Sequence, residues 1–233
     1  MNAPAGALRT LGLTKSYSSD PDDRPALAPL ALDVPNGQRL ALVGHNGSGK
    51  TTLLRMVAGL LDPTSGRAEV VGHPSGSTAA RAAAAYLSDQ PTFYDDLSLR
   101  EHLEFVARLH GVHDWTDAAE ALAARLGLGE RLDELPMTFS RGLRQKAAVT
   151  LAFIRPFELL LVDEPFVGLD LAGKDALLAM FDDATRRGAT LVVATHELSF
   201  VDTVDRVVAL ADGELRYDGA PGDTDVHALV RHG

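Results

Sequence analysis

Residues 44–51 combine the glycines, the lysine and the hydroxyl that a phosphate-binding loop requires. They read Gly-His-Asn-Gly-Ser-Gly-Lys-Thr and follow the pattern Gly-x-x-x-x-Gly-Lys-Thr. Glycines allow successive backbone amides to point at phosphate, Lys50 can reach the outer phosphates, and the Thr51 hydroxyl can ligate Mg2+. An apolar strand precedes the loop and a helical pattern follows it, which directs a helix N-terminus at the anion. This predicts binding and hydrolysis of a nucleoside triphosphate. The expected contacts are Gly44, His45, Asn46, Gly47, Ser48, Gly49, Lys50, Thr51 and Thr52.

Two adjacent carboxylates, Asp163 and Glu164, follow the apolar run Leu-Leu-Leu-Val at 159–162. Ligands of open α/β sheets collect at the C-terminal ends of strands, where these two side chains are expected. Asp163 would belong to the Mg2+ shell, and Glu164 would polarise the attacking water. An acidic pair after a strand is, taken alone, more often a helix cap or a solvated turn. The upstream phosphate loop favours the catalytic interpretation.

The composition fits one globular domain with no nucleic-acid surface. The chain has 233 residues, of which 45% are hydrophobic and 23% charged, enough apolar surface for one sizeable core. A net charge of -10 argues against a surface that neutralises a phosphate backbone or anionic lipid. There are no cysteines, which excludes disulfides and thiol chemistry and fits a cytosolic protein. Residues 1–6 show no targeting pattern, and no apolar run is long enough to span a bilayer.

The intervals between the motifs predict alternating strands and helices, an α/β arrangement. Apolar segments of strand length are expected at 7–13, 30–34, 38–43, 68–71, 159–162 and 190–194, with a hairpin of 206–210 and 214–217. Helices are expected at 50–58, 142–154 and 171–187, and two more within 97–126. Ser98 and Glu101 form a capping box for the first of these two, Gly111 ends it, and Thr116 or Asp117 starts the second. The interval 97–126 therefore reads as a helical insertion between sheet-forming segments.

Together these features make the chain resemble the nucleotide-binding subunit of ABC transporters, of the exporter type, from Tyr17 to the final hairpin. Gln90, after the apolar residues 85–87, resembles the glutamine of the Q-loop, and His196 resembles the switch histidine. Tyr17 resembles the aromatic residue that stacks on adenine. The resemblance implies catalytic roles for Glu164, His196 and Gln90. It implies Mg2+ contacts from Thr51, Gln90 and Asp163.

Residues 139–146, Phe-Ser-Arg-Gly-Leu-Arg-Gln-Lys, resemble the family signature, and residues 168–170, Gly-Leu-Asp, resemble its D-loop. The commonest signature is Leu-Ser-Gly-Gly-Gln, from which Phe139, Arg141 and Leu143 depart, while Ser140 and Gly142 remain. A hydroxyl and an unobstructed amide at a helix N-terminus suit a γ-phosphate held by the opposite protomer. Val167, where Ser or Thr is common, is a milder departure. The implied contacts to the partner's nucleotide are Ser140, Arg141, Gly142 and Asp170.

Each of these residues also has a purely structural interpretation. Gln90 alone is typical of a solvated loop, and His196 alone is typical of a strand end or a cap. Tyr17 could be part of the core. Asp170 could cap the helix that begins at Leu171, which is compatible with a functional role.

The resemblance also implies a fold, cofactors and partners. The expected fold is a P-loop NTPase core with a mixed β-sheet flanked by helices, an antiparallel β subdomain and an inserted helical subdomain. Residues 1–233 would form one ABC ATPase domain, with 1–90 and 148–233 as the core and about 91–147 as the helical signature subdomain. The cofactors would be ATP and Mg2+. Two subunits would pair head to tail, as a homodimer or heterodimer, on the cytoplasmic face of the membrane beside transmembrane permease subunits, which residues 91–95 would contact.

Other functions remain open from the residues alone. A non-transport ABC ATPase of repair, translation or iron-sulfur assembly would usually carry coiled-coil insertions, duplicated cassettes or basic arms, which this acidic chain lacks. A P-loop kinase or GTPase would leave Ser140, Gly142 and His196 unexplained. A catalytically silent cassette is disfavoured because Lys50, Asp163, Glu164 and His196 are all present. Residues 163–166 also resemble haem-exporter ATPases of cytochrome c maturation. The transported substrate cannot be read from this chain.

Overall fold

The structure is a computed structural model that describes residues 6–18, 20, 23–223 and 225. Its larger sheet has six strands in the order β10-β9-β3-β8-β7-β6. Five of them run parallel, and β10 joins β9 antiparallel through the predicted hairpin. The strands are β3 (Arg39–Val43), β6 (Ala84–Leu87), β7 (Leu159–Asp163), β8 (Thr190–Ala194), β9 (Arg206–Ala211) and β10 (Glu214–Gly219).

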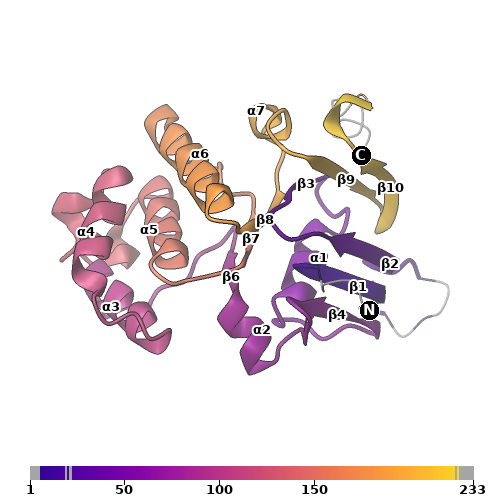
Figure 1. The fold of residues 1–233 in the computed structure, drawn as a ribbon, viewed down its shortest axis with the longest axis horizontal. Coiled ribbons are helices and arrows are strands. Elements are labelled where there is room, and N and C mark those ends of the chain that lie inside the picture. The colour runs from indigo at the N-terminus through magenta and orange to yellow at the C-terminus, as the bar shows by residue number, and fades with distance from the viewer. Residues whose placement is uncertain (1–5, 19, 21–22, 224, 226–233) are drawn as a thin grey trace.

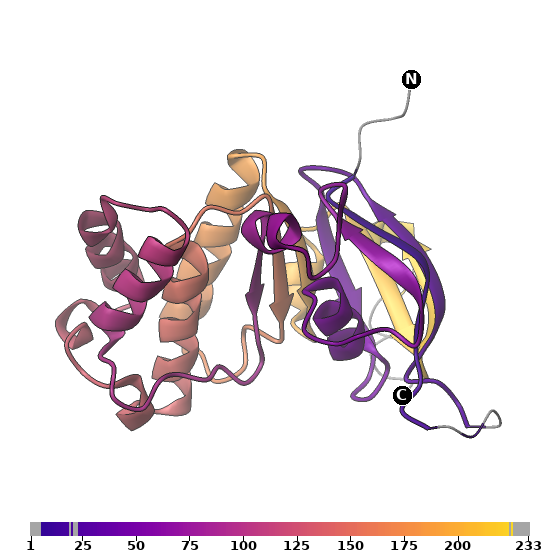
Figure 2. The same ribbon diagram turned by 90° about the horizontal axis from the view of Figure 1, so that it is seen from below.

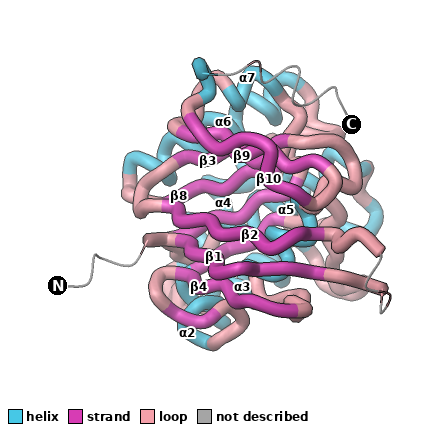
Figure 3. Tube along the Cα trace, turned by 90° about the vertical axis from the view of Figure 1, so that its right-hand side faces the viewer, coloured by secondary structure: helices cyan, strands magenta, loops and turns pink. Residues whose placement is uncertain are grey.

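A second, antiparallel sheet of four strands has the order β2-β1-β4-β5. Its strands are β1 (Leu8–Lys15), β2 (Leu27–Val34), β4 (Ser65–Val70) and β5 (His73–Pro74). Figure 3 shows the two sheets from the end opposite the helical layer, with β10 and β9 above and β2, β1 and β4 below. Helix α1 (Lys50–Val57) starts directly after the phosphate loop and packs against β4 and β7.

The remaining helices lie mostly at the other end of the molecule, where α3, α4 and α5 pack against one another (Figures 1 and 2). They are α2 (Thr78–Ala83), α3 (Leu99–Leu109), α4 (Trp115–Arg125), α5 (Arg141–Phe153), α6 (Leu171–Arg186) and α7 (Leu198–Val201), with short 3-10 turns at Gly129–Arg131, Pro136–Thr138 and Pro221–Asp223. In the part of the chain that the structure describes, no helix has the length and apolarity to cross a membrane.

Alternate residues of the parallel strands serve two separate cores. Ala41 and Val43 of β3 face the cluster that includes the helical layer, whereas Leu40 and Leu42 face the cluster shared with α1 and the smaller sheet. This is the period of two expected for a strand that is covered on both faces, and it explains why the central strands read as continuous apolar runs. The phosphate loop is therefore held between two packed layers.

Most predicted elements are present, with shifted ends. The mixed sheet, the antiparallel sheet and the helical layer confirm the predicted fold class. The capping box is confirmed, because the Glu101 side chain accepts from the Ser98 amide (2.7 Å) and the Ser98 hydroxyl accepts from the Glu101 amide (3.3 Å). Strand β2 begins at Leu27 rather than residue 30, and the second inserted helix begins at Trp115. Residues 73–83, to which the sequence pattern assigned no element, form β5 and α2. Residues 1–5 of the N-terminal segment lie outside the described residues.

Candidate active site

The phosphate loop occupies residues 44–49, between the end of β3 and the start of α1. Gly44 has φ 143°, and a Cβ there would lie 2.1 Å from the Leu210 carbonyl oxygen. Gly49 has φ 105°, and a Cβ there would lie 2.7 Å from the Ala26 carbonyl oxygen. Both positions therefore need glycine, for conformation and for space. The loop is fitted against β9 on one side and against the segment before β2 on the other.

The hairpin turn of β9 and β10 braces the same loop. The Gly213 amide donates to the Ser48 carbonyl (3.1 Å), and the Asp212 amide lies 3.4 Å from His45 Nε2. The Asp212 carboxylate lies 3.6 Å from the same nitrogen. The predicted loop residue His45 thus contacts a turn that is 167 positions away in the chain.

Lys50 is buried within the loop. Its ammonium donates to the Gly44 carbonyl (2.5 Å) and the His45 carbonyl (3.2 Å), and its Nζ lies 3.8 Å from Glu164 Oε1. Burial lowers the pKa of Lys50, while the nearby carboxylates of Glu164 and Asp163 act in the opposite direction. The ammonium is therefore a desolvated cation beside amides that can bind phosphate.

Asp163 ends β7 with a fully buried side chain. Neither of its carboxylate oxygens makes a well-formed hydrogen bond within the described residues. Burial raises the pKa of Asp163, opposed by the Thr51 hydroxyl, Lys50 and Arg55. A buried carboxylate with open oxygens, beside a hydroxyl on the first turn of α1, is a donor set that suits Mg2+. The residues present therefore fit the metal.

Glu164 and His196 form a close pair within the site. Glu164 Oε1 lies 3.0 Å from His196 Nε2, and the Glu164 amide donates to the Ala194 carbonyl (2.9 Å), which joins the ends of β7 and β8. Glu164 has φ 46°, a conformation that non-glycine residues rarely adopt. Burial raises the pKa of Glu164 to about 7, against the lowering effect of Lys50. Burial and Lys50 lower the pKa of His196. A carboxyl group that titrates near neutrality is suited to proton transfer.

Gln90 and Tyr17 are less enclosed. Gln90 is exposed just beyond β6, its amide donates to the Ser88 hydroxyl (3.2 Å), and its side chain lines a cavity of about 610 Å3. The Tyr17 side chain is 70% exposed, and Lys15 Nζ lies 5.3 Å from its ring centroid. Within the described residues, no hydrogen bond or ion pair joins either side chain to the phosphate loop.

The signature residues lie at the N-terminus of α5, against the D-loop of the same chain. Ser140 is the N-cap and its hydroxyl accepts from the Leu143 amide (3.3 Å). A Cβ on Gly142 would lie 2.4 Å from the Gly168 carbonyl oxygen. Asp170 caps α6, as the structural interpretation predicted, and also pairs with Lys146 (Oδ1 to Nζ, 2.8 Å), which holds the pKa of Asp170 below its usual range. Signature and D-loop thus form one surface.

A family model described as "ABC transporter" matches residues 27–167, more than half of the chain. The chain belongs to the ABC transporter family. A P-loop kinase or GTPase of another family is thereby excluded. As an ABC ATP-binding subunit, the chain binds ATP and is an ATPase that supplies energy to transport.

Similar proteins cover most of this ABC subunit. SkfA peptide export ATP-binding protein SkfE of Bacillus subtilis (strain 168) is 34% identical, with 81% of this chain and 80% of that protein aligned. ABC-type transporter ATP-binding protein EcsA of the same organism is 33% identical, with 89% and 84% aligned. A solved structure described as the ATP binding subunit of an ABC transporter has a TM-score of 0.86 at 28% identity, covering 97% and 95% of the two chains. A dimeric cassette bound to ADP and Pi shares the fold, with a TM-score of 0.83 at 21% identity and coverage of 92% and 98%.

Some contacts of the ABC subunit's site are not visible in its motifs. The turn at Asp212 is recognisable as a hairpin, yet its contact with His45 depends on which strands are neighbours. Tyr86 and Arg55 lie beside Asp163 and influence one another's pKa, but neither belongs to a motif. Lys174 pairs with Glu197 directly after the switch histidine (Nζ to Oε2, 2.5 Å).

Proposed function

We propose that the chain binds Mg-ATP on its phosphate loop and hydrolyses it with Glu164 as the general base. The observation that carries this proposal is the convergence of Lys50, Asp163, Glu164 and His196 at the ends of β3, β7 and β8, with Glu164 Oε1 3.0 Å from His196 and 3.8 Å from Lys50. Asp163 ends β7, Glu164 and His196 follow β7 and β8, and Lys50 begins α1 after the loop that leaves β3; these three parallel strands neighbour one another in the sheet. Loop amides and Lys50 bind the outer phosphates, and Tyr17 stacks on the adenine.

Hydrolysis of a bound triphosphate depends on positioning and charge stabilisation more than on covalent chemistry. When bound, Mg2+ neutralises phosphate charge, and Thr51, Asp163 and Gln90 would hold it. Glu164 orients the attacking water and accepts its proton, for which a pKa of about 7 is suitable. His196, kept neutral by its lowered pKa, holds Glu164 and contacts the γ-phosphate.

Two chains pair head to tail, as a homodimer or a heterodimer, so that each ATP lies between the phosphate loop of one chain and the signature of the other. Ser140, Arg141, Gly142 and Asp170 are the residues that meet the partner's nucleotide. Their exposure supports this arrangement, because Ser140 and Arg141 lie on the surface at a helix N-terminus and the Asp170 side chain is 65% exposed. ATP then stabilises the closed dimer, and hydrolysis releases it.

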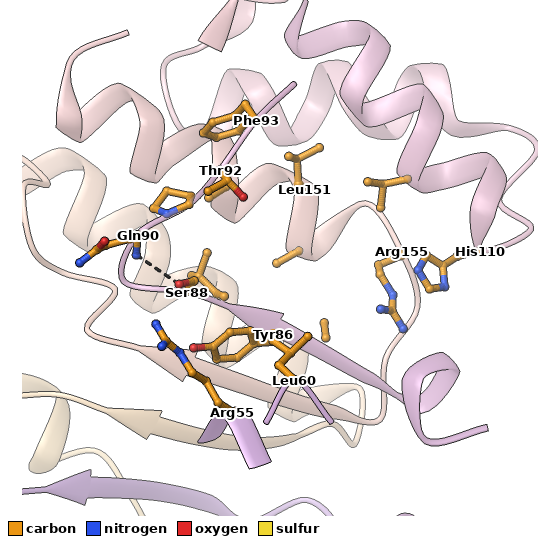
Figure 4. Close-up of a pocket in the computed structure, with 16 residues that line it drawn as sticks. Arg55, Leu60, Tyr86, Ser88, Gln90, Thr92, Phe93, His110, Leu151 and Arg155 are labelled. Carbon is orange, nitrogen blue, oxygen red and sulfur yellow. Dashed lines mark hydrogen bonds between the residues drawn. The ribbon is translucent and has the colours of Figure 1, made fainter. Parts of the chain in front are cut away.

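The membrane subunits dock on the cytoplasmic side, in the cavity beside Gln90. Figure 4 shows Gln90 at one end, Arg155 and His110 at the other, and Tyr86 and Leu60 between them. Its cations are Arg55 and Arg155, and among the residues that the structure describes no acidic side chain lines it. An apolar segment with a carboxylate would therefore fit. Phe93 lies half-buried in this wall, whereas Tyr94 is 57% exposed.

The helical signature subdomain, residues of about 91–147, would carry this docking wall and the signature together. Helix α5 continues past it to Phe153 and packs on β6, which gives the subdomain a rigid link to the core. The cargo is not assigned. The relative named for peptide export supports an export direction.

The head-to-tail arrangement is tested by mixing two inactive variants. Lys50→Ala removes the phosphate cation, and Ser140→Ala removes the contact across the dimer, so each homodimer should lose turnover. A mixed dimer contains one intact site, with Lys50 from one chain and Ser140 from the other. An equimolar mixture should therefore recover about a quarter of the wild-type sites, since half of the random dimers are mixed and each holds one intact site of two. The rate of ATP hydrolysis is measured against protein concentration.

The control mixes Lys50→Ala with Glu164→Gln, two changes on the same side of the site. That mixed dimer has no intact site and should stay inactive. Recovery in the control, or no recovery in the test mixture, would contradict the composite site.

A further inference from the structure

The loop that carries His196 is fixed to two different parts of the chain. The Thr195 amide donates to the Leu42 carbonyl of β3 (3.2 Å), and the Thr195 hydroxyl accepts from the Glu197 amide (2.9 Å). On the other side, the Glu197 carboxylate pairs with Lys174 of α6 (Oε2 to Nζ, 2.5 Å). His196 therefore lies between a tie to the central sheet and a tie to α6.

The first turn of α6 has a second ionic tie, to the signature helix. Asp170 accepts from the Gly173 amide (3.0 Å) and from Lys146 Nζ (2.8 Å). A Cβ on Gly173 would lie 2.7 Å from both Asp170 Oδ1 and Lys146 Cε, so the absence of a side chain there admits the lysine. Lys146 lies in α5, about one turn after Gly142. One turn of α6 separates the two ties, since the Lys174 amide donates to the Asp170 carbonyl (2.9 Å).

Neither ion pair is placed to contribute much to the stability of the fold. The Lys174 and Glu197 side chains are 34% and 30% exposed, and in the other pair Lys146 is 13% and Asp170 65% exposed. Ion pairs with a partner in contact with water typically contribute little to the stability of a fold. The core below them is held by apolar packing, in which Phe200 of α7 contacts Phe166 and Phe181. Removing either lysine should therefore leave the chain folded.

We infer that Lys146 and Lys174 are positioning residues that act in series through the first turn of α6. The position of the signature helix, which meets the partner's nucleotide, would in this way set the position of His196 beside Glu164 in the same chain. Lys146 passes a displacement of α5 to Asp170, and Lys174 passes a displacement of α6 to Glu197. This inference rests on the proposed roles of the signature, Glu164 and His196.

The first test is Lys174→Met in the full chain, assayed with saturating Mg-ATP. The expected kcat is about tenfold lower, because His196 loses its tie to α6, while the ATP dissociation constant stays within about twofold. Lys174→Arg should restore most of kcat, since it retains the charge. Arg186→Met is the matched control: it removes a cation paired with Asp183 at the far end of the same helix and should leave kcat unchanged.

The second test is a double-mutant cycle, which a merely structural role would not satisfy. If the two lysines act in series, Lys146→Met combined with Lys174→Met should lower kcat no further than the more damaging single change. Independent roles would instead multiply the two losses, and this result would overturn the inference. A wild-type kcat in Lys174→Met would also overturn it. If the inference fails in one of these two ways and Glu164→Gln still loses turnover, the proposed function stands without the two lysines.

Discussion

At the phosphate-loop end Lys50 and Asp163 are buried, whereas at the signature end Ser140 and Asp170 are exposed. The Lys50 side chain is 6% exposed and Asp163 is fully buried, but the Asp170 side chain is 65% exposed and Ser140 lies on the surface. Burial shifts the pKa of Lys50, Asp163 and Glu164, and the chain itself supplies that environment. At the signature end the relevant features are geometric: Gly142 lies close to Gly168, and the N-terminus of α5 is exposed.

This difference in burial separates two requirements of ATP hydrolysis: an environment for proton transfer, and the assembly of the site from two chains. The buried half can tune proton transfer without a partner, because desolvation is already present. The exposed half offers donors whose effect depends on what is brought against them. Changes in the buried half should therefore act on the chemical step, and changes in the exposed half should act on the assembly of the site.

The largest effect is expected for Glu164→Gln, which keeps the shape of the side chain and removes its basicity. Turnover should fall by about 10³-fold, within the range that general acid–base catalysis contributes. ATP binding and ATP-driven dimer formation should remain, because the loop amides and Lys50 are unchanged. Single-turnover ATP hydrolysis and light scattering with ATP measure the two properties. A normal rate in this variant would remove the general-base assignment.

Gly142→Ala tests the exposed half in the same way. The added Cβ would lie 2.4 Å from the Gly168 carbonyl oxygen, so signature and D-loop must separate. A displacement of this kind should lower kcat by about 10²-fold with little change in ATP binding to the isolated chain. Gly129→Ala is the matched control, because its nearest neighbour would be Ala124 Cα at 3.8 Å, an ordinary contact. Equal rates in the two variants would show that the close contact has no role.

The features that the sequence predicts correctly are those determined by residues close together in the chain. The phosphate loop, the central strands, the capping box at Ser98 and the N-cap at Asp170 all depend on residues within a few positions of one another. Residues 73–83 carry no local pattern that predicts an element, because β5 has two residues and α2 is a short alanine-rich segment. The contact of Gly142 with Gly168 and that of His45 with Asp212 depend on the strand order and on packing between elements. No single sequence contains a local signal for them.

The pH dependence of turnover should follow the buried half alone. Glu164 must be deprotonated to accept a proton, and its pKa is about 7. We expect kcat to rise about tenfold between about pH 6 and about pH 8, with a midpoint near 7. Stability should change in the opposite direction. The folded pKa lies above the ordinary value of 4.5, so the native state keeps a proton that the unfolded state loses, and stability falls as pH rises from 4.5 to about 7.

Urea unfolding at several pH values measures this second effect, with Glu164→Gln as the control. That variant should lack the part of the fall that Glu164 contributes, since its side chain does not titrate. Identical stability profiles for the two proteins would mean that Glu164 is not perturbed by burial.

Tyr17 is an exception to the comparison, because its proposed role places it in the nucleotide-binding half yet its side chain is 70% exposed. Lys15 donates to the Asp62 carbonyl (2.8 Å) with its ammonium 5.3 Å from the ring centroid, which limits where the ring can lie. Tyr17→Ala should weaken ATP binding about fivefold by loss of stacking and leave kcat at saturation unchanged. Tyr17→Phe should bind as the wild type does, since the stacking face is retained. Calorimetry measures the dissociation constant. An unchanged value in Tyr17→Ala would contradict stacking, and ATP binding in this half would then depend on the buried residues alone.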